Sequence, residues 1–354
     1  MTPLPELAPE GTPGPVLARH RATMRDVAAR AGVSLKTVSR VINREPGVST
    51  TLAQRVEAAA AELDFRPNLG ARSLRRADGK TATIGLVLQD LANPYSAALH
   101  RAVEDIARAR GVAVLSGSVD ETTDRERELI TAFSSRRVDG LVIMPTGSDH
   151  AYLMLERRAG VAMVFVDRPP QHLDADVVLA ANRDGARDGV AHLIAQGHRD
   201  IAFLGDLATI RTAEERYAGY ASAMTEAGLP LRGDLMVKNL DTADAAQAAT
   251  QRLLALPHPP TALFGAQNLV TIGALRALRD AGRQFEVALV GFDDFELADL
   301  LQPAVTVVAQ DPQEIGHLAA ERLFARLDGD DSPFHTDVVT TRLIVRGSGE
   351  IPPR

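Results

Sequence analysis

Short apolar runs alternate with stretches of helical periodicity from Thr83 onward, and this alternation restricts the possible folds more than any other feature. The runs are TIGLVLQ, VAVLSGS, GLVIMP, AMVFVD, VVLAAN, IAFLGD, MVKNL, ALFGA, ALVGFD and VTVVAQ. Strands that alternate with helices predict parallel sheets covered by helices on both faces. About ten strands is many for one open sheet, so we predict two doubly wound units, near Thr83–Ala181 and Asn182–Ala309.

The last part of the chain should cross back between these two units, with a helix over Pro312–Leu327 and a strand over Val338–Arg346. Two such lobes leave a cleft at the carboxyl ends of the strands, where open α/β sheets bind ligands. The expected bounds are 81–354 for the whole core, about 81–181 and 310–335 for its N-subdomain, and about 182–309 and 336–350 for its C-subdomain.

A different pattern, at Thr23–Asn43, predicts two short helices joined by a tight turn. Thr23 followed three residues later by Asp26 is typical of a capping box at the start of a helix. Gly32 permits a sharp turn of the backbone, and Ser34 can cap the second helix. The segment therefore indicates a helix-turn-helix unit.

The second helix of this pair has two chemically different faces. Val38, Val41 and Ile42 repeat at helical spacing and predict a buried stripe. The other face carries Leu35, Lys36, Ser39, Arg40 and Asn43. A helix that buries valines and presents such groups suits the major groove of DNA. The plainer alternative is an amphipathic helix pair whose polar face is only solvated.

The distribution of charge favours the DNA alternative, although the chain carries a net charge of −7. Between Arg19 and Lys80 there are 13 basic and 6 acidic residues, whereas the remainder holds 26 basic and 40 acidic residues. A basic amino-terminal segment on an acidic body is what a DNA-binding headpiece attached to a sensor requires, because phosphate neutralisation is local.

Two further segments complete the headpiece, which we expect at residues 21–67. Ser49 is expected to cap a third helix whose apolar residues share one face. The basic segment Asn68–Lys80 then leaves two interpretations open. It is either a charged linker, or a hinge helix that folds on DNA and inserts Leu74 between base steps in the minor groove.

Composition excludes several classes of protein. Residues 1–20 are rich in Pro, Glu and Gly, which predicts a disordered tail and not a secretory signal. The chain has no cysteine, no membrane-length apolar run, no phosphate-binding glycine loop and no nucleophile elbow. His192 and His198 lack the spacing of metal ligands, and we interpret His198 as a helix-terminal or loop residue. We therefore expect a cytoplasmic protein that is not an enzyme, with no cofactor, metal or membrane partner.

These motifs, in their order, resemble the lactose-repressor/galactose-repressor (LacI/GalR) family of bacterial transcription regulators from about Thr23 to Gly347. The resemblance rests on DVAARAGVSLKTVSRVIN, VSTTLAQRVEAAAAELDFRPN, ARSL, NPYS, VDGLVI, VFVDR, HLIAQGHRDIAFLGD, ERYAGY, PTALFGAQNLVTIGALRAL, VGFDD and VAQD. It implies an N-terminal all-α helix-turn-helix headpiece, a hinge helix and linker at 68–80, and a two-lobed α/β core like that of periplasmic binding proteins. It also implies a homodimer on a near-palindromic operator of double-stranded DNA.

The resemblance implies which residues contact DNA. Lys36 and Arg40 would donate to guanine, and Leu35 would make apolar contact, such as with a thymine methyl group. Arg72 and Leu74 match the hinge helix of the family, and Leu74 matches its intercalating leucine. The full implied set is Thr23, Ser34, Leu35, Lys36, Thr37, Ser39, Arg40, Asn43, Asn68, Ala71, Arg72 and Leu74.

The resemblance also implies a small-molecule effector, namely a sugar, a sugar phosphate or a related polyol. Arg216 matches the arginine that holds the effector in known members, and its alternative role is an ion pair near a helix start. Asp167 at a strand end would accept hydrogen bonds from hydroxyl groups, and Tyr95 would stack on a ring. The full implied set is Asn93, Tyr95, Asp167, Arg216, Asn268, Asp293 and Gln310.

Asn268 departs from the family pattern, because many members carry an aspartate there. The amide loses the negative charge and adds donors, which makes an anionic or phosphorylated ligand easier to accept. Arg211, close to Arg216 in the sequence, hints at the same class of ligand unless it lies on an exposed loop. Without an appended leucine heptad, a dimer is expected instead of a tetramer.

Two other functions remain open at this point. The core alone would suit a periplasmic-type sugar-binding protein without a DNA role, although the helix-turn-helix and the missing signal argue against it. An enzyme on a doubly wound fold is the second alternative, because fold does not fix function, but no motif supports it.

Overall fold

The computed structural model describes residues 22–43, 45–66, 80–147 and 149–354. The chain separates into two compact units, Met1–Gly79 and Lys80–Arg354, which we call the headpiece unit and the core. The expected tail at 1–20 and hinge helix at 68–79, with Asn68, Ala71, Arg72 and Leu74, lie outside the described residues.

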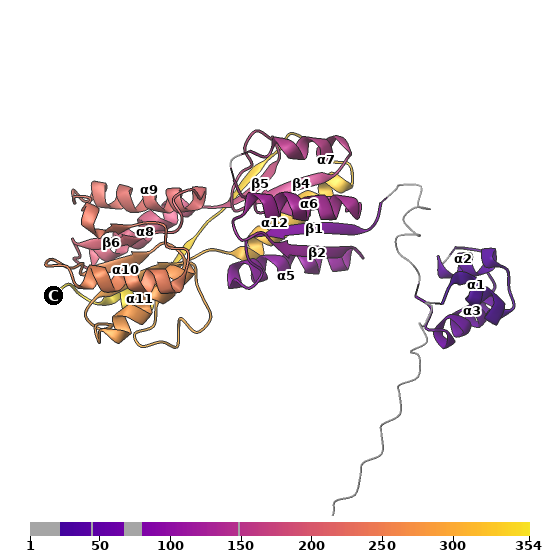
Figure 1. The fold of residues 1–354 in the computed structure, drawn as a ribbon, viewed down its shortest axis with the longest axis horizontal. Helices are drawn as coiled ribbons and strands as arrows, with labels where there is room; N and C mark the ends of the chain where they lie inside the picture. The colour runs from indigo at the N-terminus through magenta and orange to yellow at the C-terminus, as the bar shows by residue number, and fades with distance from the viewer. Residues whose placement is uncertain (1–21, 44, 67–79, 148) are drawn as a thin grey trace, which may run out of the picture. The chain divides into compact units, whose positions relative to one another are not determined.

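The headpiece consists of three short helices, α1 (Met24–Ala31), α2 (Leu35–Ile42) and α3 (Thr50–Glu62) (Figure 1). Val27, Val38 and Val56, one from each helix, are completely buried against one another. The small core follows from the apolar spacing in each helix.

The predicted helix starts are confirmed at α1 and α2. Thr23 and Asp26 form a capping box on α1, and Gly32 ends that helix with φ 64°. The hydroxyl of Ser34 accepts a hydrogen bond from the backbone N of Thr37 at 3.1 Å. Ser49 occupies the N-cap position of α3, but its side chain makes no capping hydrogen bond within the described headpiece.

The core contains two six-stranded sheets with equivalent strand orders, β11-β5-β4-β3-β1-β2 and β12-β10-β9-β8-β6-β7 (Figure 1). The strands of the first sheet are β1 (Thr83–Leu88), β2 (Ala113–Ser118), β3 (Gly140–Ile143), β4 (Ala162–Val166), β5 (Asp176–Ala180) and β11 (Thr336–Val339). Those of the second are β6 (Ile201–Leu204), β7 (Met236–Val237), β8 (Ala262–Gly265), β9 (Ala288–Phe292), β10 (Thr306–Ala309) and β12 (Arg342–Ile344). Neighbouring strands are parallel, except that β12 runs antiparallel to β10.

Helices cover both sheets, as the alternating sequence predicts. In the first lobe they are α5 (Pro94–Ala109), α6 (Thr123–Ser135), α7 (Met154–Arg158) and α12 (Pro312–Leu327). In the second lobe they are α8 (Asn182–Ala195), α9 (Arg211–Glu226), α10 (Ala243–Leu254) and α11 (Asn268–Asp280). The pairs α5–α12, α8–α9 and α10–α11 pack together, and the apolar side chains between helices and strands form the cores of the two lobes.

The chain passes three times between the lobes: from β5 to α8, from β10 to α12, and from β11 to β12. The single strand expected over Val338–Arg346 is therefore wrong. The first lobe extends to Val339, which pairs with Ala180, and only Arg342–Ile344 joins the second sheet. No Gly or Pro marks this change of sheet, and only Thr340 and Thr341 separate the two strands.

Candidate ligand site and nucleic-acid-binding helix

Two aspartates occupy equivalent positions in the two lobes. Asp167 directly follows β4, and Asp293 directly follows β9. Both have positive φ values, 68° and 69°, which non-glycine residues rarely adopt. Each backbone N donates to the next strand, to the carbonyls of Val178 and Val308 respectively. Such backbone strain clusters at functional sites, and these positions are the carboxyl strand ends where ligands bind in this class of fold.

Arg216, on α9, is the buried centre of the second lobe's polar network. Its Nε donates to Oδ1 of Asn182 at 2.8 Å, and its Nη1 donates to the carbonyl of Ala266 at 2.8 Å. The same Nη1 lies 3.3 Å from Oδ2 of Asp293, and the guanidinium lies 4.0 Å above the ring of Phe292. These contacts hold the guanidinium in one orientation.

The Arg216 network reaches two of the three crossings between the lobes. Asn182 is the first residue after the β5–α8 crossing, and Gln310 lies in the β10–α12 crossing. Nε2 of Gln310 donates to Oδ1 of Asp293 at 2.5 Å. A hydrogen-bonded series therefore runs from Asn182 through Arg216 and Asp293 to Gln310. Arg216 is therefore connected to one crossing directly, through Asn182, and to the other through Asp293.

Asp167 belongs to a matching network in the first lobe. Oδ2 of Asp167 accepts from Nε of Arg168 at 3.1 Å, and the other two nitrogens of Arg168 bind Glu121 at 2.8 and 2.6 Å. Burial lowers the pKa of Arg168, but the hydrogen bond to Glu121 and the charge of Asp167 outweigh it and raise that pKa above its ordinary value. The arginine is fixed as a cation by two carboxylates.

Tyr95, in the first turn of α5, lies among these charged groups. Its hydroxyl is buried and has no hydrogen-bond partner within the described chain. Burial raises the pKa of Tyr95 well above its ordinary value, and the charges of Asp167 and Asp293 raise it further. Because those two aspartates belong to different lobes, Tyr95 lies where the lobes meet. We call Tyr95, Asp167, Arg216, Asp293 and Gln310 the inter-lobe site.

Asn93 and Asn268 connect the lobes beside this site. Nδ2 of Asn268, the first residue of α11, donates to Oδ1 of Asn93 at 3.2 Å. Asn93 also caps α5 by accepting from the backbone N of Tyr95 at 3.0 Å. The hydrogen bond from the Asn268 amide therefore joins the two lobes. All seven predicted effector residues lie in this one region of the core.

Arg211 is not part of this region. Its Nε binds Glu215 at 2.9 Å on the exposed side of α9, one turn before Arg216. Other residues that join the site were not expected from the sequence: Glu121, Arg168, Asn182, Asp206 and Gln267. Asp206 had a visible signal, because it lies just after the carboxyl end of β6, one residue further on than Asp167 after β4 and Asp293 after β9. Asn182 had none, since its contact depends on where the chain crosses between lobes.

The α2 helix presents the predicted DNA-binding side chains around its solvent face. Leu35 is 43% exposed, which leaves it free for apolar contact. Lys36 is exposed, while the amide of Asn43 donates to the hydroxyl of Ser39 at 3.3 Å. Arg40 is half-buried, and its Nη2 donates to the carbonyl of Pro46 at 2.6 Å.

The remaining features are structural. His198 is buried between the Thr261 hydroxyl at 2.9 Å and the carbonyl of Ile351 at 2.8 Å, as expected for a residue beside a turn. No group of three metal-binding side chains occurs among the residues with described positions. Across those same residues, no helix has the length and apolarity to span a membrane.

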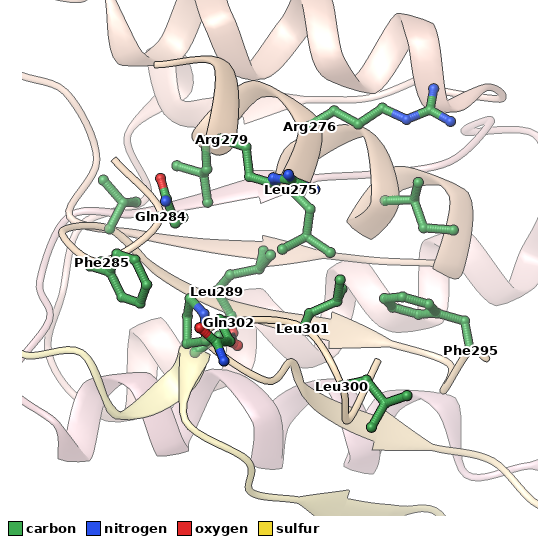
Figure 2. Close-up of a pocket in the computed structure, with 15 residues that line it drawn as sticks. Leu275, Arg276, Arg279, Gln284, Phe285, Leu289, Phe295, Leu300, Leu301 and Gln302 are labelled. Carbon is green, nitrogen blue, oxygen red and sulfur yellow. Dashed lines mark hydrogen bonds between the residues drawn. The ribbon is translucent and has the colours of Figure 1, made fainter. Parts of the chain in front are cut away.

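An apolar hollow of about 530 Å³ lies on the second lobe, bounded by α11, β9 and the loop that follows β9. Figure 2 shows Leu275 of α11 and Leu301 of that loop pointing towards it. At its edge, Leu300 is 71% exposed and Phe285 is 55% exposed, and Leu297 in the same loop is 58% exposed. A concentration of exposed apolar side chains marks an interaction surface.

Comparison with known proteins matches both parts of the chain. A model of the bacterial regulatory proteins of the lacI family matches residues 23–68, and a model of a periplasmic binding protein-like domain matches residues 190–349. The HTH-type transcriptional regulator PtxS of Pseudomonas aeruginosa is 36% identical over 94% of this chain and 96% of its own length. The HTH-type transcriptional repressor PurR of Erwinia tasmaniensis is 33% identical over 92% of this chain and 96% of its own length.

The chain is also similar to solved structures of transcription regulators. The lac repressor dimer bound to operator and the anti-inducer ONPF has a TM-score of 0.81 at 28% identity, over 93% of this chain and 99% of that one. The complex of the transcriptional regulator CelR with cellobiose has a TM-score of 0.69 at 31% identity, over 93% of this chain and 100% of that one.

Proposed function

This chain belongs to the lacI family of bacterial regulatory proteins and is a DNA-binding transcription regulator, and we propose that it is a repressor that binds a near-palindromic operator as a homodimer. We further propose that a small molecule in the inter-lobe site sets its affinity for DNA. Because the proposed target is operator DNA, the proposed compartment is the cytoplasm, and we propose no catalytic role.

The observation that carries this proposal is the α2 helix. Val38 is completely buried and Val41 nearly so, which fixes the orientation of the helix on the headpiece. The opposite side then presents Leu35 and Lys36 to solvent. We propose that these two residues and Arg40 contact bases in the major groove, and that Thr23, Ser34, Thr37, Ser39 and Asn43 position the helix on the backbone. Arg40 would exchange the carbonyl of Pro46 for a guanine.

For residues 68–79 the proposal rests on the family alone. Asn68, Ala71 and Arg72 would form a hinge helix on DNA, and Leu74 would enter the minor groove. Unstacking one base step costs a few kcal/mol, and the bent DNA repays it with further contacts.

Control by an effector is supported by the network at Arg216. A ligand that binds Arg216 changes a hydrogen-bonded series that already includes Asn182 and Gln310 in two crossings. Differential binding to two arrangements of the lobes shifts their populations. The CelR–cellobiose complex supports a sugar or related polyol as the class of effector.

The homodimer is supported by the apolar hollow on the second lobe (Figure 2). Leu297, Leu300 and Phe285 are exposed around it, and a second copy of the chain would bury them. The similar lac repressor structure is a dimer bound to operator. A two-fold dimer presents two α2 helices to two half-sites, so a near-palindromic operator follows from the symmetry.

Selection of DNA by the full chain tests the proposal. Double-stranded oligonucleotides are enriched from a random pool, sequenced, and titrated by fluorescence anisotropy with and without sugars. We expect an inverted repeat whose affinity falls steeply with salt and changes when an effector is added. Enrichment of no sequence, together with tight sugar binding, would instead favour a sugar-binding protein without a DNA role.

A further inference from the structure

Acidic side chains outnumber basic side chains around the inter-lobe site. The acidic side chains are Glu121, Asp167, Asp206 and Asp293, and the basic ones are Arg168 and Arg216. All six are connected by hydrogen bonds or by mutual charge effects. The site therefore carries an excess of negative charge before any ligand binds.

Five of the six guanidinium nitrogens of Arg168 and Arg216 already donate hydrogen bonds within the described core. Each nitrogen of Arg168 already donates, to Asp167, to Glu121 and to the carbonyl of Pro145. In Arg216, Nε and Nη1 donate to Asn182, Ala266 and Asp293, which leaves Nη2 as its only nitrogen without a hydrogen bond in the described core. A phosphate or carboxylate needs several donors.

Besides Nη2 of Arg216, two buried groups of the site lack a hydrogen-bond partner in the described core, and both can accept. Oε1 of Gln310 is buried without a hydrogen-bond partner in the described core, and it can only accept. The Tyr95 hydroxyl is equally buried and unpartnered, and it can accept as well as donate. A ligand that satisfies both must donate hydrogen bonds, as hydroxyl groups do and carboxylates and phosphate dianions do not.

Helix starts could supply donors to an anion, but three of those at the strand ends are already capped. Asn93 caps α5, Gln267 caps α11 and Asp311 caps α12, each by accepting a backbone N–H in the first turn. Each cap occupies one of the N–H groups by which a helix start binds anions, and so reduces the donors that these three starts can offer.

Asp206 adds a charge that the other groups do not offset. It follows β6 and accepts from the backbone N of Leu207 at 2.7 Å and from Nε2 of Gln267 at 3.1 Å. Both partners are neutral, and the carboxylate has no ion pair among the residues that the structure describes. Burial raises the pKa of Asp206, which hydrogen bonds from Leu207 and Gln267 partly offset, and Arg216 and Glu121 are close enough to affect it.

Resting on the proposed function, we propose that the inter-lobe site selects an uncharged polyhydroxylated effector, and that Asp206 is the residue that rejects anionic analogues. The acceptors of Tyr95, Gln310 and Asp167 bind ligand hydroxyls, and the unpaired charge of Asp206 repels phosphate and carboxylate groups. The hint of an anionic ligand from Arg211 has no counterpart in the site, because Arg211 pairs with Glu215.

The experiment compares matched probes that differ in charge. Glucose, galactose and ribose are each tested beside their terminal phosphate ester and their aldonic acid. Binding to the full chain is measured by calorimetry and thermal shift at about pH 8, well above the ordinary pKa of an aspartate. We expect the tightest probe to be an uncharged sugar, with its phosphate and acid at least about tenfold weaker.

Two variants isolate Asp206. Asp206→Asn should reduce the discrimination against the phosphate about tenfold. Asp280→Asn is the matched control. Asp280 is exposed at the last residue of α11, and its substitution changes the net charge by the same amount as Asp206→Asn. Its discrimination should equal that of the wild type.

The outcomes separate this inference from the proposed function. A phosphate or acid as the tightest probe overturns the inference, and so does the absence of binding by every probe. An unchanged preference in Asp206→Asn overturns the role of Asp206, and the wild-type ranking stays informative if that variant does not fold. Binding of the same preparation to its selected DNA is measured in parallel, and its loss counts against the proposed function alone.

Discussion

The side-chain amide of Asn268 donates to Oδ1 of Asn93 over 3.2 Å, and this hydrogen bond joins the second lobe to the first. Both residues begin helices that point towards the inter-lobe site. The bond therefore stabilises the arrangement of the lobes seen here, and its strength should be measurable by a double-mutant cycle.

In that cycle, Asn93→Ala and Asn268→Ala are combined and the free energy of unfolding is measured by urea titration. Asn93→Ala also removes the α5 cap, so the two single losses differ. The coupling free energy should be about 0.5–1.5 kcal/mol, the net contribution of one hydrogen bond. A coupling near zero would show that the contact does not hold the lobes together.

Asp293→Ala should be strongly destabilising. It leaves the buried Arg216 guanidinium without its carboxylate and Nε2 of Gln310 without its acceptor, and removing one partner of a buried pair costs about 3–5 kcal/mol. The matched control is Asp244→Ala, since Asp244 pairs with Arg276 at the surface and its loss should cost less than about 1 kcal/mol. Equal losses in melting temperature would contradict the role given to the buried network.

Arg40→Ala should weaken binding to the selected operator by about 1–3 kcal/mol and relax specificity at one base position. The comparison variant is Arg30→Ala, because Arg30 pairs with Glu62 on α3 and is not on the α2 face. Anisotropy titrations against single-base operator variants give both quantities. If Arg40→Ala ranks those operators in the wild-type order, Arg40 does not read a base.

Leu300→Asp should dissociate the proposed homodimer, because it places a carboxylate in an apolar interface. The monomer should keep its melting temperature, since Leu300 is 71% exposed and contributes little to the monomer's own core. Leu155→Asp is an equally exposed control, at 72%, on α7 of the first lobe. Light scattering coupled to gel filtration gives the oligomeric state of each variant. If both variants formed equally stable dimers, the surface around Leu300 would not be the dimer interface.

The stability of the core should decrease as the pH is lowered through the range where histidines titrate. Burial lowers the pKa of His198, which the hydrogen bond to the carbonyl of Ile351 partly offsets. A folded pKa below the unfolded value of about 6.5 means that unfolding takes up a proton. The stabilisation is therefore present above about pH 6.5 and is lost as pH falls through the lower folded value. His198→Gln should flatten this part of the profile, whereas exposed His317→Gln should not.

Local features of this chain could be predicted because they depend on neighbouring residues. The Thr23–Asp26 capping box and the buried stripe of Val38 follow from spacing alone. The convergence of Tyr95, Asp167 and Asp293 follows from their positions at strand ends. The partner of Arg40 is a backbone carbonyl at Pro46, which no side-chain pattern marks. The Asn182–Arg216 contact depends on where the chain crosses between lobes, and so does the division between β11 and β12.

The three crossings also determine the order in which the parts of the protein are completed during synthesis. The headpiece core closes between Val27 and Phe65, so its contacts are available early. The first lobe lacks α12 until Leu327 and β11 until Val339 have been made, although its other strands come before residue 181. Domains fold as units during translation. A ribosome that stopped before residue 312 would therefore release a chain in which the proposed DNA-recognition helix is complete and the proposed sensor is not.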